Sequence, residues 1–393
     1  MKIIADENIP FVKECFSSIG EVQALSGRKI TPDVVADADC LLVRSITPVN
    51  EKLLSKSKVK FVATATIGFE HVDIDYLKKR GIGFASAPGS NANSVAEYIV
   101  AALLSVGKKY KITLEGTSIG IVGVGNVGSK VAQKCKSLGM KVLLNDPPLS
   151  RQTGDKKYRP LSELFDCDFI TLHTPLTKEG QDKTFHLADD KFFASLKPGC
   201  VFINTSRGSV HDTASLKEAI QSGKLDAVIL DVWENEPNID CELLRAVDIS
   251  TPHIAGYSLD GKIAGMIMIY KAAYNHFGLK PKCKIDDLLP PPAVPQITVE
   301  KVDADPASPK GYAEASQQSL LNEIVQQVYC INRDDFNTRE IATVEPAKRG
   351  KFFDDLRKNY PVRREFQNTT VIFKQPCLPF AKKLEGIGFI VKI

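Results

Sequence analysis

Three polar residues of this sequence are of the types that together oxidise an alcohol beside a carboxylate. Arg207 lies in INTSRG, Glu236 in DVWENEP and His253 in STPHIAG. An arginine holds a carboxylate with two parallel hydrogen bonds. A histidine accepts the hydroxyl proton as hydride leaves, and a glutamate on its other ring nitrogen holds the tautomer and favours the imidazolium. The set predicts proton abstraction coupled to hydride transfer.

Each of the three residues also has an ordinary structural interpretation. A histidine after a proline is often a satisfied loop residue, an arginine after a strand often pairs with a surface acid, and a glutamate before a proline often ends a turn. Their joint placement favours function, because each follows a predicted strand and the carboxyl ends of parallel strands line the ligand crevice. The remaining histidines are not accompanied by such a set of polar residues at strand ends, and we interpret most of them as structural: positions 71, 173, 186, 211 and 276.

A glycine pattern predicts dinucleotide binding. SIGIVGVGNVGSK contains Gly123, Gly125 and Gly128 in the order G-x-G-x-x-G, after a predicted strand and at the start of a helix. The first glycine permits a tight turn, the second lets the backbone approach a pyrophosphate, and the third allows helix and strand to pack closely. The next strand, KVLLND, ends in Asp146, where a carboxylate binds the ribose and repels a 2′-phosphate. The pattern favours NAD; a chance glycine turn and a turn-forming aspartate are the alternatives.

Alternating strand and helix patterns place these motifs in an α/β framework. Residues 1–95 alternate short apolar strands with helical stretches, and a helix is predicted over 93–110. A second series over 118–252 contains six predicted strands, which fit one doubly wound sheet, and a helix follows over 258–278. The four prolines within 290–295 predict a linker, because proline fits neither a helix interior nor a central strand. The residues after this linker predict a small α+β appendage.

Composition excludes several classes of protein. With 393 residues, 43% of them hydrophobic, the chain is long enough for two or three domains. No apolar run approaches the roughly 20 residues of a bilayer span, and the N-terminus lacks the secretory pattern, so we expect a cytoplasmic protein without a membrane partner. A net charge of +4 does not indicate nucleic-acid binding. The nine cysteines are scattered, which predicts reduced packing thiols and no metal site.

Five motifs in order resemble those of the D-isomer-specific 2-hydroxyacid dehydrogenases: GIVGVGNVG, HTPLTKEG, INTSRGSV, DVWENEP and TPHIAG. The resemblance implies an NAD-dependent enzyme with a Rossmann-like, doubly wound NAD-binding domain over 96–254. It implies a flavodoxin-like substrate domain formed by 1–95 and 255–284. A small α+β domain over 285–393 is then a C-terminal dimerisation domain, so that the partner is a second copy of the chain.

The same resemblance assigns roles to individual residues. Arg207 and Glu236 are then active-site residues, and His253 is the proton donor or acceptor. Three residues are implied to contact substrate: Ser45, Thr66 and Tyr257. The residues implied to contact NAD are Gly123, Gly125, Gly128, Asp146, Thr174, Asp231 and Gly256. Ordinary structural interpretations stay open for the secondary positions, as strand-end turn residues for Ser45, Thr66 and Asp231 and as an aromatic anchor for Tyr257.

Three further details resemble one member of the family, which oxidises a phosphorylated 2-hydroxy acid at C2 in the pathway to pyridoxal 5′-phosphate. They are LLVRSIT, the extended HIAGYSLDGK, and a tail with DDLLPPP and FFDDLRKNYPVRREF. The substrate phosphate then requires a cation, for which Arg44 is one candidate. The basic tail of a neighbouring subunit is another, although we favour a solvated charged face for it: Lys348, Arg349 and Lys351.

Two departures from the family pattern leave the substrate fit open. The loop TIGFEHVD carries Phe69 and Glu70 where a smaller and differently acidic loop is usual, and His211 stands where an apolar residue is usual. Two other functions also stay open. One is a related dehydrogenase, such as one acting on 3-phosphoglycerate or an unphosphorylated hydroxy acid, and the other is an NAD-sensing regulatory binding protein. The complete set of arginine, glutamate and histidine argues against the sensor, which needs no proton acceptor.

Overall fold

The chain divides into two compact units, which we describe separately. The computed structural model describes residues 1–280, 283, 289–302 and 310–393. One unit comprises 1–92 and 258–291, and the other comprises 93–257 and 292–393. The predicted start of the C-terminal domain at 285 lies outside the described residues, and the division into three domains stays a prediction. We call residues 292–393 the C-terminal module.

The first unit is built on a five-stranded parallel sheet in the order β2-β1-β3-β4-β5, the order of flavodoxin-like folds. Its strands are β1 (Lys2–Asp6), β2 (Glu21–Leu25), β3 (Cys40–Val43), β4 (Phe61–Thr64) and β5 (Gly83–Ala85). One face packs against α1 (Val12–Phe16) and α11 (Leu259–Phe277), and the other against α2 (Pro32–Val35), α3 (Glu51–Leu54) and α4 (Ile74–Lys79). The predicted flavodoxin-like fold and the helix predicted over 258–278 are confirmed.

The expectation of reduced cysteines is wrong for one pair of this unit. Cys15 and Cys283 form a disulfide with their Cα atoms 4.9 Å apart. The two residues are 268 positions apart, and α1 and the segment after α11 bring them together. Sequence spacing contained no signal for this pair, because the contact depends on how α1 and α11 pack on one face of the sheet.

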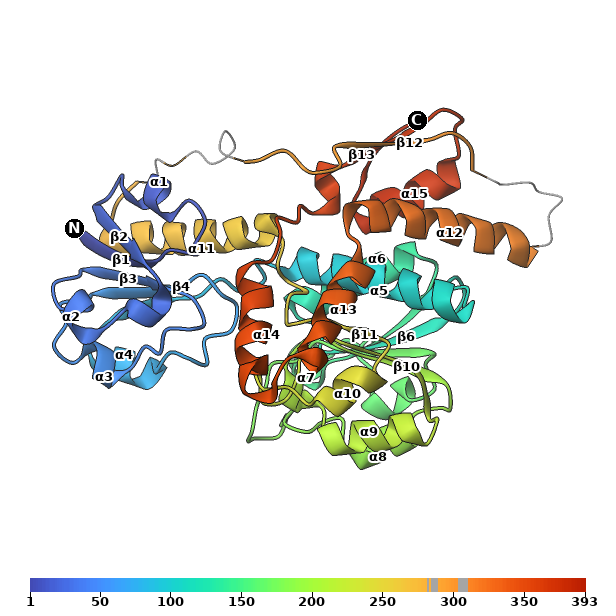
Figure 1. Cartoon of the computed structure of the whole chain (residues 1–393), viewed down its shortest axis with the longest axis horizontal. Helices are drawn as coiled ribbons and strands as arrows, with labels where there is room; N and C mark the ends of the chain where they lie inside the picture. The colour runs from blue at the N-terminus through green and yellow to red at the C-terminus, as the bar shows by residue number, and fades with distance from the viewer. Residues whose placement is uncertain (281–282, 284–288, 303–309) are drawn as a thin grey trace. The chain divides into compact units, whose positions relative to one another are not determined.

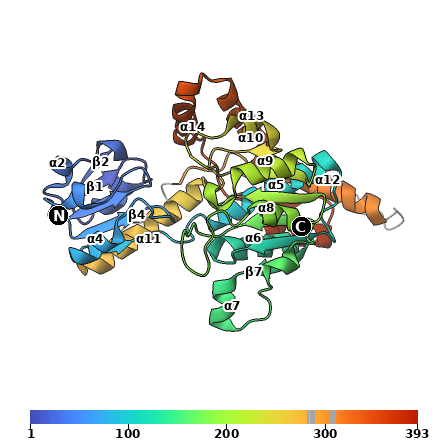
Figure 2. The ribbon, with the colours of Figure 1, turned by 90° about the horizontal axis from the view of Figure 1, so that it is seen from below.

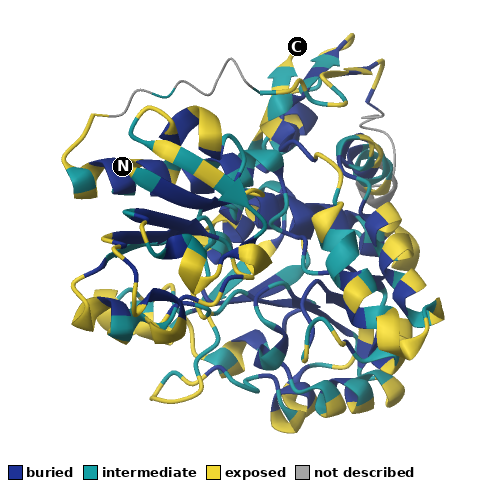
Figure 3. Cartoon of the chain, turned by 60° about the vertical axis from the view of Figure 1, so that its left-hand side comes forward, coloured by how far each residue is buried: buried dark blue, intermediate teal, exposed yellow. Residues whose placement is uncertain are grey.

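The second unit is built on a six-stranded parallel sheet in the order β11-β10-β9-β8-β6-β7. Its strands are β6 (Ser118–Val122), β7 (Lys141–Asn145), β8 (Phe169–Leu172), β9 (Cys200–Asn204), β10 (Leu225–Leu230) and β11 (Ile249–Ser250). The chain reverses direction across the sheet between β6 and β8, which defines the topological switch point of a doubly wound fold. The central strands of both large sheets are buried, whereas edge strands such as β2 and β7 are only partly buried (Figure 3), which explains the continuous apolar sequences of the central strands. The six predicted strands are confirmed.

Helices cover both faces of this sheet. One face packs against α5 (Ala92–Tyr110) and α6 (Asn126–Ser137), and the other against α8 (Asp190–Ser195), α9 (Thr213–Gln221) and α10 (Cys241–Ala246). A short helix, α7 (Pro147–Thr153), follows β7. The helix predicted over 93–110 is α5, which is buried over most of its length and exposed in its last turn.

The C-terminal module mixes a small sheet with helices, as predicted. Its parallel sheet has the order β12-β13-β14, from β12 (Gln296–Val299), β13 (Thr370–Phe373) and β14 (Ile390–Lys392). The helices are α12 (Lys310–Val328), α13 (Ile331–Arg339), α14 (Arg349–Lys358) and α15 (Leu378–Ile387). α15 lies along α6 (Figure 1), and α13 lies beside β11 and near α10 (Figure 2). The module therefore shares a hydrophobic core with the six-stranded sheet.

The predicted linker is in part confirmed. Residues 290–295 form neither helix nor strand, and β12 begins directly after them. The DDLL part of the linker lies largely outside the described residues. Among the helices that the structure describes, none combines the length and apolar character that a membrane span requires.

Candidate active site

The three candidate catalytic residues follow three neighbouring strands of the second unit. Arg207 comes after β9, Glu236 after β10 and His253 after β11, and these strands are adjacent in the sheet order. Because all three strands are parallel, their carboxyl ends lie at one edge of the sheet. The topology thus brings together residues that are widely separated in sequence.

Glu236 and His253 form a hydrogen-bonded pair. Oε2 of Glu236 lies 2.7 Å from Nδ1 of His253, and Oε1 accepts the backbone N–H of Trp233 at 2.9 Å. The carboxylate partner assigns the ring proton to Nδ1, which leaves the lone pair on Nε2. Burial alone would raise the pKa of Glu236, but His253, the Trp233 N–H and Arg357 outweigh it and lower that pKa. The acid therefore stays ionised and orients the imidazole.

The buried carboxylate of Asp231 fixes the loop that carries His253. Its Oδ1 accepts from the Thr251 hydroxyl at 2.6 Å and from the Ile254 N–H at 2.7 Å, and its Oδ2 accepts from the Ala255 N–H at 3.0 Å. His253 adopts the left-handed conformation with φ of 58°, which is unfavourable for a non-glycine residue. Asp231 thus holds a strained catalytic turn in place, and its predicted contact with NAD stays a prediction.

The turn that carries Arg207 lies directly against the loop that carries Glu236. A Cβ atom on Gly208 would lie 2.0 Å from the carbonyl carbon and oxygen of Trp233, so only glycine fits there. Arg207 is partly buried, and its Nη1 donates to the Ser206 carbonyl oxygen at 2.8 Å. The close approach of the two turns fixes the guanidinium at the same strand edge as the acid–histidine pair.

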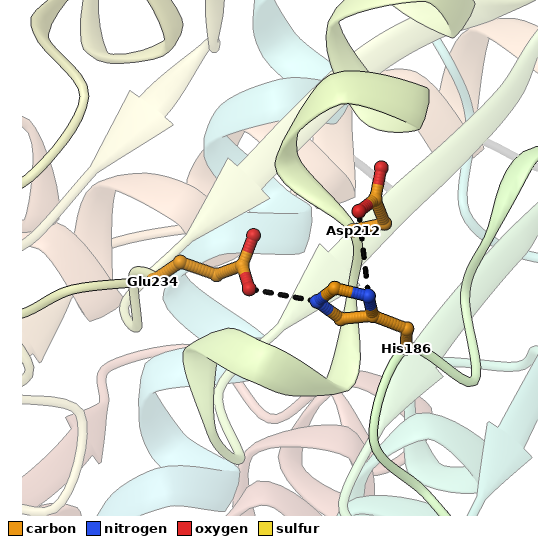
Figure 4. Close-up of side chains that lie close together, drawn as sticks. All are labelled: His186, Asp212 and Glu234. Atoms are coloured by element: carbon orange, nitrogen blue, oxygen red, sulfur yellow. Dashed lines mark hydrogen bonds and ion pairs between the residues drawn. The ribbon is translucent and has the colours of Figure 1, made fainter.

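A second histidine anchors the other end of the Glu236 loop. His186 lies between two carboxylates, with Nε2 at 2.8 Å from Glu234 Oε1 and Nδ1 at 3.4 Å from Asp212 Oδ2 (Figure 4). Glu234 Oε2 also accepts the Thr213 N–H at 3.0 Å. The ligand atoms of His186, Asp212 and Glu234 lie within 4.8 Å of one another, as in a cation site. Because each carboxylate already accepts hydrogen bonds, we interpret the cluster as a structural anchor.

The glycine motif lies at the topological switch point. It joins β6 to α6, and Gly123 has φ of 87°, which favours glycine. A Cβ there would lie 2.7 Å from the His173 carbonyl oxygen, next to the end of β8. A Cβ on Gly128 would lie 2.0 Å from the Gly123 carbonyl oxygen, whereas a Cβ on Gly125 would enter open space. The first and third glycines are therefore required by packing, and the second leaves room for a ligand beside the N-terminus of α6.

Two polar groups beside the glycine turn also fit a dinucleotide. Asp146 follows β7, where its Oδ2 accepts the Val124 N–H at 2.8 Å and its Oδ1 caps α7 through Leu149 N–H at 2.9 Å. The hydroxyl oxygen of Thr174 is buried and has no hydrogen-bond partner within the described parts of the chain. A buried hydroxyl of this kind is normally satisfied, so a ligand group is the expected partner. The residues present therefore fit the NAD that the sequence predicts.

The histidine beside this turn is not a candidate base. His173 bonds to the hydroxyl oxygens of Thr171 and Thr205 at 3.0 and 3.3 Å, and burial lowers its pKa to about 3. His211, the unusual residue of the SRGSVHD motif, is fully buried with Nδ1 at 3.0 Å from Asn204 Nδ2. Burial lowers its pKa to about 4, so it is a neutral residue of the core.

The predicted substrate contacts are divided between the two units. Tyr257 belongs to the second unit, four residues after His253. Ser45 and Thr66 belong to the first unit, where they follow the neighbouring strands β3 and β4 at one edge of that sheet. Thr66 is bonded within its own loop, its hydroxyl donating to the Gly68 carbonyl oxygen at 2.9 Å, whereas Ser45 is exposed. Their contacts with substrate, and that of Gly256 with NAD, stay predictions.

Sequence reasoning missed the residues that the C-terminal module places beside this site. Arg357 of α14 lies against Tyr257, and Arg363 donates to the Ala255 carbonyl oxygen at 2.7 Å. In contrast, the predicted phosphate candidates of the tail are engaged within the chain, with Lys348 paired to Glu345, Lys351 to Asp355, and Arg349 bonded to the Val344 carbonyl oxygen. No motif distinguishes Arg357 from these neighbours; only its position on α14 does.

Comparison with known proteins agrees with this geometry. The family model of the D-isomer specific 2-hydroxyacid dehydrogenase NAD binding domain matches residues 98–255, and a model described as a domain of unknown function matches residues 288–388. Erythronate-4-phosphate dehydrogenase of Escherichia fergusonii is 44% identical over 95% of this chain and 94% of its own length. That of Cronobacter sakazakii is 44% identical over 99% of this chain and 98% of its own.

Solved structures share the fold. D-lactate dehydrogenase from Aquifex aeolicus, complexed with NAD and lactic acid, is 27% identical with a TM-score of 0.57, over 71% of this chain and 96% of that one. A protein from Thermus thermophilus has a TM-score of 0.62 at 23% identity, over 72% of this chain and 98% of that one. The chain belongs to the D-isomer-specific 2-hydroxyacid dehydrogenase family of NAD-dependent oxidoreductases, among the erythronate-4-phosphate dehydrogenases.

Proposed function

We propose that this protein oxidises 4-phospho-D-erythronate at C2 to 2-oxo-3-hydroxy-4-phosphobutanoate, with NAD⁺ as the oxidant, in pyridoxal 5′-phosphate synthesis. One observation carries the proposal: the 44% identity to erythronate-4-phosphate dehydrogenase extends over 99% of the chain, C-terminal module included. The hydrogen-bonded Glu236–His253 pair at the carboxyl edge of the NAD-binding sheet supports the chemistry.

The side chains divide the reaction into three tasks. Arg207 binds the substrate carboxylate, which places C2 and its hydroxyl beside His253. His253 takes the hydroxyl proton on Nε2 while its Nδ1–H donates to Glu236, whose charge stabilises the imidazolium. As the O–H bond breaks, the C2–H electron pair leaves as hydride and a C=O bond forms. Bound NAD⁺ supplies the hydride acceptor.

The enzyme is proposed to act as a homodimer in the cytoplasm, paired through the C-terminal module. Phe336 and Val362 are each 66% exposed and Leu378 is 62% exposed, so the module presents large apolar side chains to solvent. Exposed large apolar side chains are enriched at protein interfaces, which supports a contact surface on this module. Sedimentation of the full chain tests the dimer, and Phe336→Asp and Val362→Asp are expected to shift it to monomer. A monomeric parent protein would contradict the proposal.

Initial rates of NAD⁺ reduction test the reaction. The substrates are 4-phospho-D-erythronate, D-erythronate and 3-phospho-D-glycerate, with His253→Asn as the inactive control. We expect kcat/KM for 4-phospho-D-erythronate to exceed that for D-erythronate by at least about a hundredfold, because an unpaired phosphate site rejects the smaller acid. A preference for 3-phospho-D-glycerate would indicate a related dehydrogenase. Tight NADH binding without turnover of any acid would indicate an NAD-sensing protein.

A further inference from the structure

The loop that carries Tyr257 is held by side chains of the C-terminal module. The Tyr257 ring lies edge-on to that of Tyr360, with the ring centroids 6.0 Å apart. The guanidinium carbon of Arg357 lies 5.8 Å from the centroid of the same ring. Arg363 adds a hydrogen bond of 2.7 Å to the carbonyl oxygen of Ala255. Three residues from a separate part of the sequence thus restrain the turn after the catalytic histidine.

Arg357 lies beside an aromatic ring and an acid of its own helix. Its guanidinium carbon lies 5.9 Å from the Phe353 ring centroid, and its Nη1 lies 3.9 Å from Asp354 Oδ1, a long separation for an ion pair. Its Nε is buried and has no hydrogen-bond partner in the part of the chain that the structure describes. A buried guanidinium is costly unless other charged or polar groups compensate it.

Tyr257, Glu236 and Asp354 compensate the buried guanidinium. Burial alone would lower the pKa of Arg357, but interactions with these three residues outweigh it and raise that pKa. The interaction is reciprocal, since Arg357 is among the groups that lower the pKa of Glu236. Arg357 therefore favours the ionised form of the catalytic acid.

The neighbouring cations of α14 do not share this position. Arg349 donates to the Val344 carbonyl oxygen at 2.9 Å, and Lys351 pairs with Asp355 on the same helix. Lys358, directly after Arg357, is exposed. Among the basic residues of α14, Arg357 is the one whose contacts lead to the active site.

We propose that Arg357 is a positioning residue of the active site, through which the C-terminal module holds Tyr257 and maintains a positive charge beside the Glu236–His253 pair. The inference rests on the proposed dehydrogenase function of that pair. Since a nearby cation disfavours protonation of a carboxylate, Arg357 keeps Glu236 ionised, and so able to orient His253, at lower pH. It also restrains the tyrosine ring that faces it by a cation–π contact.

The test compares Arg357→Gln, Arg357→Lys and the charge-matched control Lys358→Gln in the full-length enzyme. We expect R357Q to lower kcat by at least about tenfold, because small displacements in an active site are costly. The acidic limb of its kcat/KM profile should move to higher pH. R357K keeps the charge and should restore the position of that limb, while K358Q should behave as the parent enzyme. The Kd for NADH should stay within about twofold in all variants, because the coenzyme groups are untouched.

A profile of R357Q with an unmoved acidic limb would overturn the proposal, even if kcat fell. If R357Q does not fold, Arg357→Met removes the same charge and keeps the apolar stem. A parent enzyme that does not oxidise 4-phospho-D-erythronate would contradict the proposed function instead. In that case a carbon-13 NMR titration of the Glu236 carboxylate in the NADH complex decides, because it needs no turnover. The Glu236 midpoint should rise in R357Q and not in K358Q, and equal midpoints would reject the role of Arg357.

Discussion

Glu236 holds His253 with one carboxylate oxygen while its other oxygen is fixed by the protein backbone. Oε2 lies 2.7 Å from Nδ1 of His253, and Oε1 lies 2.9 Å from the Trp233 amide nitrogen. The indole N–H of Trp233 in turn donates to the Thr251 carbonyl oxygen at 2.9 Å, two residues before the histidine. The acid, the tryptophan and the histidine turn therefore form one closed set of contacts, which orients the imidazole before substrate binds.

Glu236→Gln is expected to lower kcat by about 10²- to 10⁴-fold, because the amide keeps the shape of the acid but not the charge that stabilises the imidazolium. The acidic limb of the kcat/KM profile should move to lower pH, opposite to the shift expected for R357Q. Glu242→Gln on α10 is the control, since Glu242 pairs with Lys217 away from the site. Steady-state kinetics over a range of pH checks both effects. A variant that keeps more than about half of the parent kcat would exclude a catalytic role for Glu236.

The glycine turn allows coenzyme binding and folding to be separated with two alanine variants. Gly125→Ala should leave the Tm of the coenzyme-free protein nearly unchanged, because its Cβ enters open space, but should weaken NADH binding by at least about tenfold. Gly128→Ala should lower the Tm, because its Cβ would lie 2.0 Å from the Gly123 carbonyl oxygen. Thermal unfolding and NADH fluorescence titration measure the two properties. Equal effects of both variants on Tm would refute this division of roles.

Much of the architecture could be predicted because local pattern and tertiary role agree. The strand SIGIV, the three glycines and the following helix need only nearby residues to form, and the buried central strands have continuous apolar sequences. β2 (EVQAL) could not be located from sequence, because it is an edge strand with only partly buried side chains and its apolar pattern is weak. In the α+β appendage, the stretch QQSLLNEIVQQVYCIN has the pattern of one helix, but the structure divides it at Tyr329 and Cys330, between α12 and α13.

The site residues that follow strand ends could be predicted from the sequence, whereas those that tertiary packing brings to the site could not. Arg207, Glu236 and His253 follow adjacent strands, and the parallel sheet alone brings them to one edge. Arg357 reaches the site only because α13 and α14 pack beside β11 and the histidine turn, a relationship between segments about a hundred residues apart. The role of Asp231 as a clamp for three groups of the 251–255 turn was equally hidden, because its hydrogen bonds depend on the path of that turn.

The His186–Glu234 contact is expected to stabilise the loop that carries Glu236. Glu234→Gln should lower the free energy of unfolding by about 1–3 kcal/mol, because it removes a charged acceptor from His186 and from the Thr213 N–H. It should also lower kcat, though less than E236Q does. Burial would raise the pKa of Glu234, but Thr213 and His186 outweigh it and lower that pKa. The stabilisation is therefore present above the unfolded pKa of the acid and lost as the pH falls through the folded one.

A double-mutant cycle with His186→Gln isolates this contact. Chemical denaturation should give a smaller effect for E234Q in the H186Q background than in the parent, because the two side chains share one interaction. Fully additive effects on the free energy of unfolding would mean that Glu234 acts through Thr213 alone.

The buried His211 is expected to make the stability of the second unit depend on pH. Burial disfavours its imidazolium and lowers its pKa to about 4 from the ordinary value of 6.5, with Glu234 and Asp212 opposing only in part. Between these two values the unfolded chain binds a proton that the folded chain does not. The free energy of unfolding contributed by His211 therefore falls as the pH is lowered through this window, with a slope of up to about 1.4 kcal/mol per pH unit.

His211→Leu removes this proton, so urea unfolding at several pH values between about 7 and about 4.5 should give a shallower slope than in the parent protein. His276→Gln, a substitution of an exposed histidine, is the matched control and should keep the parent slope. Parallel slopes for H211L and the parent would mean that His211 accepts a proton in the folded state as readily as in the unfolded chain.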